Sequence, residues 1–153
     1  MMRDDMEKIV YSEADIKAKV AELGRQITED YKDAAETIYC VGILKGASVF
    51  YTDLVRQINL PVRFDFMIAS SYGNGTSTSG SVKILKDLDY DVEGKHLIII
   101  EDIIDSGTTM NYLLKYFKER KPKSVKLCSL LSKPSRRTTD VHIDYCGFEV
   151  PDE

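Results

Sequence analysis

The chain has 153 residues, of which 43% are hydrophobic and 30% charged, and its formal net charge is −4 at pH 7. This length and balance are typical of one folded domain with its own core, and they exclude an intrinsically disordered chain. The acidic mean charge argues against a general nucleic-acid surface, and no apolar run approaches the roughly 20 residues that span a bilayer, so we expect neither a nucleic-acid nor a membrane partner.

The first element that the sequence predicts is a helix. Ser12 and Asp15 have the spacing of a capping box, which closes a helix N-terminus. Apolar residues then recur every three or four positions and mark one helical face. They are Ile16, Val20, Leu23, Ile27 and Tyr31. The residues before this helix carry acids and no apolar stretch of signal-peptide length, so we expect a cytoplasmic protein.

The next part of the chain alternates strands and helices. Residues 37–44 are rich in β-formers, and residues 49–58 read as a second helix, which ends before Pro61. Residues 62–69 predict another strand. The segment 70–80, SSYGNGTSTSG, is too polar and glycine-rich to pack, so we expect a mobile loop and not a linker between domains. The whole chain, 1–153, is therefore expected to be a single domain.

The second half of the chain continues this alternation. We expect strands at 81–85, 97–100, 124–131 and 143–150, a turn region at 87–95 and a helix at 109–119. Strands that alternate with helices predict an α/β fold, with a mostly parallel twisted sheet and helices on both faces. Ligands bind such sheets beyond the carboxyl ends of the strands.

The three cysteines, Cys40, Cys128 and Cys146, form no CxxC pair, and their number is odd. Two of them lie in apolar, strand-like runs. We therefore expect small buried thiols without a disulfide framework, which fits a reducing compartment.

Residues 101–109, EDIIDSGTT, hold two opposite chemical preferences. Ser106 to Thr109 lie between a strand and a helix, where backbone N–H groups, the helix dipole and hydroxyls favour a phosphate. Gly107 permits a positive φ or a close approach. Glu101 and Asp102 would repel a phosphate but suit ribose hydroxyls or hydrated Mg²⁺. A sugar phosphate satisfies both halves of the segment.

The run IIIEDIIDSGTT resembles the phosphoribosyl-pyrophosphate (PRPP) motif of type I phosphoribosyltransferases. The similarity extends to VGILKGASVF at 41–50, SSYGNGT at 70–76, VKILKDLD at 82–89 and KPKSVKLCSLLSKPSRR at 121–137. Together these motifs resemble the hypoxanthine–guanine phosphoribosyltransferase family over nearly the whole chain.

The resemblance implies a type I phosphoribosyltransferase fold whose loop 70–80 is a flexible hairpin lid. It also implies an enzyme of purine salvage that uses Mg²⁺. Such an enzyme transfers the 5-phosphoribosyl group of PRPP to hypoxanthine or guanine and releases IMP or GMP and pyrophosphate.

The resemblance also implies a role for individual residues. Asp105 would exchange a proton with N7 of the purine, as a general acid or base. Glu101 and Asp102 would hold the ribose hydroxyls and help to place Mg²⁺. Lys133 would contact the exocyclic oxygen of a 6-oxopurine, because an ammonium group can only donate hydrogen bonds. Arg137 would lie near the pyrophosphate.

Two further regions complete the implied site. Lys45-Gly46 resembles the pyrophosphate-binding turn of the family, which often contains a cis peptide. Ser71 and Tyr72 belong to the implied lid, which would exclude water from the reaction. The implied substrate-binding residues are Lys45, Gly46, Ser71, Tyr72, Glu101, Asp102, Ile103, Ile104, Asp105, Ser106, Gly107, Thr108, Thr109, Lys133 and Arg137.

The chain departs from the family at two places. Thr108 stands where the family often has Lys or Leu. The sequence also stops at GFEVPDE, whereas the family continues through an aromatic residue that stacks on the purine and an aspartate that helps to hold Mg²⁺. A PRPP-binding regulatory module and an inactive truncated transferase therefore remain as alternatives. A P-loop nucleotidase is excluded because GxxxxGK[ST] is absent.

The preference among hypoxanthine, guanine and xanthine stays open at this point. The family usually forms homodimers or homotetramers through surfaces near the Lys45 turn, and the resemblance implies the same here.

Overall fold

The computed structural model describes residues 11–34, 36–71 and 82–151, with the backbone alone for Ser71. In this part of the chain the strands form one six-stranded sheet of order β3-β2-β1-β4-β5-β6. The elements are α2 (Glu13–Tyr31), β1 (Ile38–Leu44), α3 (Ser48–Val55), β2 (Val62–Ser71), β3 (Val82–Lys86), β4 (His96–Ile104), α4 (Thr108–Lys118), β5 (Ser124–Ser132), a 3₁₀ turn (Pro134–Arg136) and β6 (Tyr145–Glu149).

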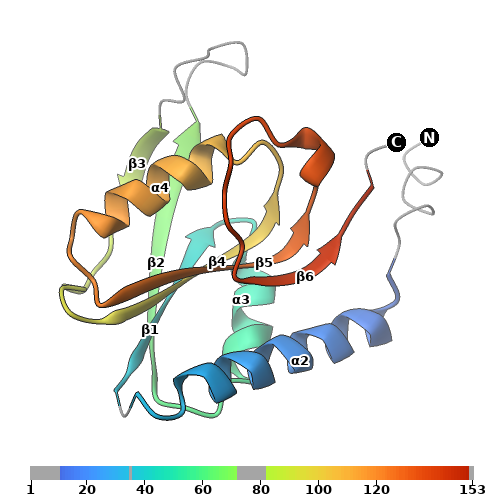
Figure 1. Ribbon diagram of the computed structural model, residues 1–153, viewed down its shortest axis with the longest axis horizontal. Coiled ribbons are helices and arrows are strands. Elements are labelled where there is room, and N and C mark those ends of the chain that lie inside the picture. Colours follow the sequence, from blue (N-terminus) through green and yellow to red (C-terminus); the bar gives the residue numbers. More distant parts are fainter. Residues whose placement is uncertain (1–10, 35, 72–81, 152–153) are drawn as a thin grey trace.

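Neighbouring strands of this sheet run parallel except for β2 and β3, which are antiparallel. Helices α2 and α3 cover one face and α4 covers the other (Figure 1). The predicted α/β architecture, a mostly parallel sheet between helices, is therefore confirmed.

The central strands are apolar on both sides because each face has its own helical layer. In β1, Ile38 and Cys40 belong to the cluster under α2 and α3, whereas Val41 belongs to the cluster under α4. In β4, residues 97–100 are all fully buried, with alternate side chains in the two clusters. This is the pattern expected of strands buried on both faces.

Helix α2 begins as its sequence predicts. The hydroxyl oxygen of Ser12 accepts the N–H of Asp15 at 2.9 Å, and the Asp15 carboxylate accepts the N–H of Ser12 at 3.4 Å, so the capping box is confirmed. The apolar face of the helix is buried at Val20, Leu23, Ile27 and Tyr31.

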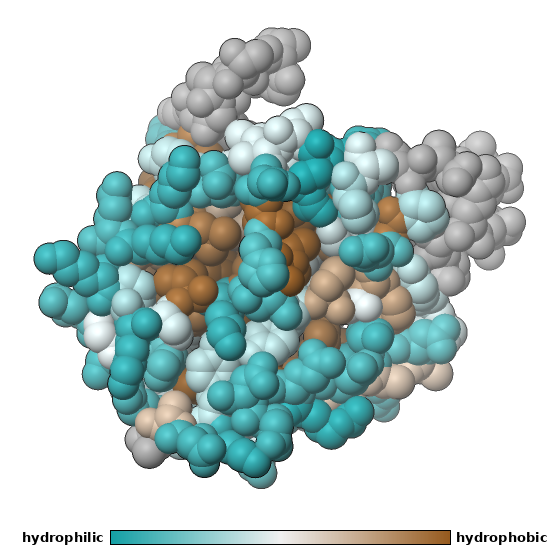
Figure 2. Space-filling view, viewed as in Figure 1, coloured by the Kyte–Doolittle hydropathy of each residue, from teal (hydrophilic) through white to brown (hydrophobic). Residues whose placement is uncertain are grey.

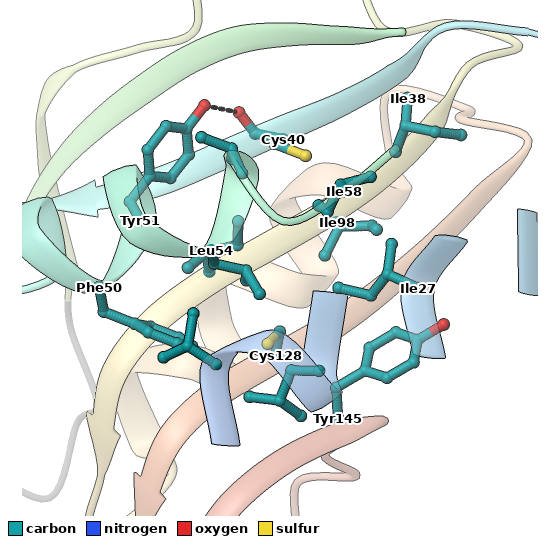
Figure 3. Close-up of a cluster of buried hydrophobic side chains, with 14 of the residues drawn as sticks. Ile27, Ile38, Cys40, Phe50, Tyr51, Leu54, Ile58, Ile98, Cys128 and Tyr145 are labelled. Atoms are coloured by element: carbon teal, nitrogen blue, oxygen red, sulfur yellow. Dashed lines mark hydrogen bonds between the residues drawn. The ribbon is translucent and has the colours of Figure 1, made fainter. Parts of the chain in front are cut away.

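Tyr51 fastens α3 to the sheet. Its hydroxyl group donates to the carbonyl oxygen of Cys40 at 2.7 Å, inside the cluster shared with α2 (Figure 3). Gly42 leaves the space that the ring needs, because a Cβ at Gly42 would lie 2.6 Å from Cδ2 of Tyr51. Because Gly42 has no side chain, α3 can pack closely against β1, the strand that ends just before Lys45.

Several predicted boundaries were wrong. Strand β4 continues to Ile104 and does not stop at residue 100, because Glu101, Ile103 and Ile104 still pair with β5 through the backbone. Strand β2 reaches Ser71, since the antiparallel β3 pairs with its end. Helix α3 ends at Val55. Strand β6 spans only Tyr145–Glu149, shorter than the predicted 143–150.

All three cysteines are free, Cys40 and Cys128 are buried, and Cys146 is partly buried. Among the described residues, no helix is long and apolar enough to cross a membrane. In Figure 2, polar side chains cover most of the visible face, and apolar ones show between them.

Candidate active site

Three chain segments, each of which follows one of three neighbouring parallel strands, lie at the same end of the sheet. Lys45-Gly46 follows β1, Asp105 to Gly107 follow β4, and Lys133 follows β5. The order β1-β4-β5 places these segments side by side, at the carboxyl ends where α/β sheets bind ligands. The peptide bond between Leu44 and Lys45 is cis, as the resemblance implied for this turn, and both Lys45 and Gly46 are exposed.

The turn after β4 is shaped by Gly107, which has a φ of 86° and caps the N-terminus of α4. The N–H of Thr108 donates to the hydroxyl oxygen of Ser106 at 3.2 Å, and the first helical bond joins the N–H of Asn111 to the carbonyl oxygen of Gly107 at 2.8 Å. The first turn of a helix leaves backbone N–H groups without helical partners, which suits an anion.

A hollow of about 250 Å³ lies at this turn. It is lined by Glu101, Ile103, Ile104, Asp105, Ser106, Gly107, Thr109 and Met110. All but Met110 belong to the predicted segment 101–109, so one short run of sequence provides nearly the whole wall. The hollow therefore joins one acidic strand residue, Glu101, to the start of a helix, whereas Asp102 is not among its lining residues.

Glu101 and Asp102 lie within β4 and not beyond it, and their burial changes their acidity. Burial raises the pKa of Glu101 to about 7, with a further increase from the Asp102 carboxylate; the N–H of Asp102, which donates to Glu101 Oε1 at 2.8 Å, opposes it. Burial also raises the pKa of Asp102. Two adjacent carboxylates whose charges are poorly solvated favour partners that are cationic or donate hydrogen bonds.

Asp105 differs from these two carboxylates because it is exposed at the turn. It directly follows the buried Ile104 and lines the same hollow as Glu101. Its carboxyl group is accessible to a molecule that enters the hollow.

Lys133 lies beside this turn. Its backbone N–H donates to the carbonyl oxygen of Ile104 at 2.9 Å, which places it next to Asp105. Arg137 points back toward the sheet: its Nη2 donates to the hydroxyl oxygen of Ser132, and its Nη1 is buried without a hydrogen-bond partner.

Ser71 lies at the end of β2, whereas Tyr72 and the rest of the implied lid lie outside the described residues. The prediction that the loop begins at residue 70 was wrong, since Ser70 and Ser71 pair with β3.

Four polar residues that support the site were not predicted from the sequence. Ser129 is fully buried, and its hydroxyl group donates to the Leu131 carbonyl oxygen at 2.6 Å. Ser132 is buried and accepts the Arg137 bond. Thr138 and Thr139 contact the turn after β4 through their backbone. For Ser129 and Ser132, a hydroxyl residue within the apolar run of β5 was the available signal, whereas the backbone contacts of Thr138 and Thr139 left none.

A family model described as the phosphoribosyl transferase domain matches residues 8–153. The chain belongs to the phosphoribosyltransferase family. The hypoxanthine phosphoribosyltransferase of Salmonella typhimurium is 52% identical over 146 residues, which cover 95% of this chain and 82% of that protein. The hypoxanthine-guanine phosphoribosyltransferase of Bacillus subtilis is 51% identical over 152 residues, covering 99% and 83%.

Solved structures of this family share the fold. A hypoxanthine phosphoribosyltransferase from Staphylococcus aureus matches with a TM-score of 0.91 and 41% identity, covering 99% of this chain and 82% of that one. A hypoxanthine-guanine phosphoribosyltransferase from Bacillus anthracis matches with a TM-score of 0.89 and 48% identity, covering 94% and 84%. The type I phosphoribosyltransferase fold that the sequence motifs implied is thereby confirmed.

Proposed function

We propose that this chain transfers the 5-phosphoribosyl group of PRPP to hypoxanthine or guanine, giving IMP or GMP and pyrophosphate in purine salvage. The observation that carries the proposal is the meeting of Glu101-Asp102, Asp105 and Lys133 at the ends of two neighbouring strands. The names of the similar proteins support the same substrates. The single sheet that joins all the described strands supports one transferase domain over residues 1–153.

In this proposal, PRPP occupies the hollow after β4. Its 5-phosphate binds the N–H groups and hydroxyls of Ser106 to Thr109 at the start of α4. The ribose hydroxyls donate to Glu101 and Asp102, since buried carboxylates gain most from hydrogen-bond donors. Ile103 and Ile104 line the hollow between the residues that bind the ribose and those that bind the phosphate.

The two carboxylates also fit Mg²⁺. Among the described residues no three His, Cys, Asp or Glu side chains converge, and this pair supplies the carboxylate donors in the proposal. One or two carboxylates plus substrate oxygens and waters are the usual ligands of protein-bound Mg²⁺. When bound there with PRPP, Mg²⁺ would neutralise negative charge on the departing pyrophosphate.

The reaction exchanges two bonds at the anomeric carbon of the ribose. Purine N9 forms the new bond as the bond to the pyrophosphate oxygen breaks, and Asp105 accepts the N7 proton that the base loses. Lys133 donates to the 6-oxo group of the base. The Lys45-Gly46 turn binds the leaving pyrophosphate, and Arg137 joins it once its guanidinium group leaves Ser132. Loop 70–80 with Ser71 and Tyr72 excludes water.

The test is to mix the full chain with PRPP, Mg²⁺ and each of hypoxanthine, guanine, xanthine and adenine, and to follow nucleotide formation by absorbance. Turnover with hypoxanthine or guanine that is lost in Asp105→Asn supports the enzyme. PRPP binding without turnover would favour the alternative of a regulatory module or an inactive transferase. Absence of PRPP binding would overturn the proposal.

We also propose a cytoplasmic homodimer or homotetramer that assembles beside the Lys45 turn. Val49 and Phe64 are 72% and 54% exposed, and Phe64 packs against Tyr51 of α3, so apolar surface lies open on the α3 side of the sheet. Size-exclusion chromatography with light scattering should give a larger mass for the wild type than for Phe64→Glu. Tyr112→Ser, on α4, is the matched control for an exposed aromatic residue.

A further inference from the structure

We propose that Thr138 and Thr139 are positioning residues that hold the base-reading segment 133–139 against the phosphate-binding turn 105–109. They would couple the two halves of the site without touching either substrate. This inference rests on the proposed function for the identity of the two substrates, although the contacts that carry it belong to the protein alone.

Backbone hydrogen bonds tie segment 133–139 at one end to β4 and at the other end to the turn that follows β4. At one end, the N–H of Lys133 donates to the carbonyl oxygen of Ile104 at 2.9 Å. At the other end, the N–H groups of Thr138 and Thr139 both donate to the carbonyl oxygen of Ser106 at 3.0 Å. The segment therefore cannot shift as a whole without breaking bonds to the turn that would hold the phosphate.

The turn and segment 133–139 also pack closely against each other at Gly107. A Cβ at this position would lie 2.5 Å from the carbonyl oxygen of Thr139 and 3.0 Å from Cδ of Arg137 and from Cγ2 of Val141. Gly107 is buried and has a positive φ. The turn thus approaches the segment so closely that no side chain fits between them, and a displacement of one is transmitted to the other.

Hydroxyl groups add a third contact. Oγ1 of Thr108 lies 3.3 Å from Oγ1 of Thr139 and 3.5 Å from Oγ1 of Thr138. Thr108 stands where family members often carry Lys or Leu, which offer no hydroxyl group. In this chain the threonine hydroxyl groups therefore join the start of α4 to the segment.

Three variants separate the contributions of the backbone and the hydroxyl groups. Thr138→Pro removes one N–H donor to Ser106 together with the Thr138 hydroxyl group, so Thr138→Val, which removes that hydroxyl group alone, is its comparison. The extended backbone of Arg137, with φ −71° and ψ 124°, is the conformation that a residue before proline adopts. Thr139→Val removes the hydroxyl group and keeps the N–H. Thr52→Val is the control, because it removes a hydroxyl bond of α3 to its own helix.

The first measurement needs no ligand. Amide hydrogen exchange of the full chain should become faster in both 104–109 and 133–140 for Thr138→Pro, and should remain unchanged for Thr52→Val. Faster exchange confined to 133–140 would overturn the proposal, because the two segments would then move independently. This readout does not depend on PRPP, so it stands even if the proposed function fails.

The second measurement is steady-state kinetics with PRPP and hypoxanthine. Loss of one net hydrogen bond predicts a rise of about three- to ten-fold in KM. We expect this rise for both substrates in Thr138→Pro, a smaller parallel rise in Thr139→Val, and a kcat within about two-fold of the wild type. Thr108→Val combined with Thr139→Val should raise KM no more than Thr108→Val alone, since Thr108→Val already removes the hydroxyl contact to Thr139. A KM that rises for only one of the two substrates would contradict the proposed coupling between the two segments.

Discussion

The backbone N–H of Lys133 donates to the carbonyl oxygen of Ile104 at 2.9 Å, which joins the segment after β5 to the end of β4. The lysine proposed to read the base is thus held within one hydrogen bond of the strand that carries the carboxylates. The next residue after Ile104 is Asp105, so the proposed acid–base group and the proposed base-reading group are fixed relative to each other by main-chain geometry.

Asp105→Asn should lower kcat with hypoxanthine by about 10²- to 10⁴-fold, the usual contribution of a general acid or base. PRPP affinity, measured by calorimetry, should change little, because the amide keeps the size of the carboxyl group at an exposed position. Asp91→Asn, an exposed change in the turn before β4, is the control and should leave kcat unaltered. A kcat for Asp105→Asn within a few-fold of the wild type would contradict the assigned role.

Glu101 should make the folded state less stable as pH rises. Its pKa is 4.5 in the unfolded chain and about 7 in the fold, so between these values the folded protein keeps a proton that the unfolded chain releases. Stability therefore falls from about pH 4.5 to 7, by up to the order of 3 kcal/mol. Urea unfolding should show Glu101→Gln gaining stability over the wild type at pH 8 and little at pH 5.

The control for this measurement is Glu119→Gln, an exposed carboxyl group at the end of α4. Its effect should be small at both pH values. If the wild type and Glu101→Gln differ by the same amount at pH 5 and pH 8, the burial of the Glu101 carboxylate does not control the pH dependence.

Mg²⁺ should stabilise the protein more at pH 8 than at pH 5.5, because Glu101 and Asp102 must be ionised to bind it. Thermal unfolding scans with Mg²⁺ and then with a chelator should show a higher Tm with the metal at pH 8. The difference should shrink in Glu101→Gln. An equal Mg²⁺ effect in this variant would place the ion elsewhere.

Gly42→Ala should destabilise the fold by about 1–3 kcal/mol, the range for an overpacked core. The new methyl group would meet the Tyr51 ring at 2.6 Å and displace a side chain whose hydroxyl group is bonded to Cys40. Gly46→Ala is the matched comparison, since nothing lies within 4 Å of a Cβ there. Chemical denaturation should separate the two, with an unchanged midpoint for Gly46→Ala.

Lys133→Gln should raise the KM for hypoxanthine and guanine about 10- to 100-fold, the range for a lost hydrogen bond from a charged donor. The glutamine amide also offers an acceptor, so discrimination against adenine should weaken. Lys118→Gln, exposed in the last turn of α4, should change neither value. Unaltered base selectivity in Lys133→Gln would exclude this lysine from base recognition.

The sequence predicted the strands and helices where periodicity and burial were strong. The all-apolar run before Glu101 and the capping box at Ser12 both appear as expected. The strand end at residue 100 was wrong because charge was read as a loop signal, whereas backbone pairing with β5 continues through Glu101 and Ile103.

The supporting contacts of the site could not be predicted in the same way. The bonds from Thr138 and Thr139 to Ser106 join backbone groups, which every residue except proline offers equally. Side-chain identity therefore carries no trace of them. The burial of Glu101 is likewise set by the layers on both sides of the sheet and not by its neighbours in sequence.

Because segment 133–139 is attached at both of its ends, some of its residues can be substituted during evolution without loss of the attachment. Its ties to Ile104 and Ser106 use main-chain atoms only, while Pro134 and Ser135 between them are exposed. Substitutions in the middle of the segment can therefore alter what a descendant protein selects without rebuilding the anchor points. The scaffold for the sugar phosphate would be inherited intact while the chemistry of its acceptor diversifies.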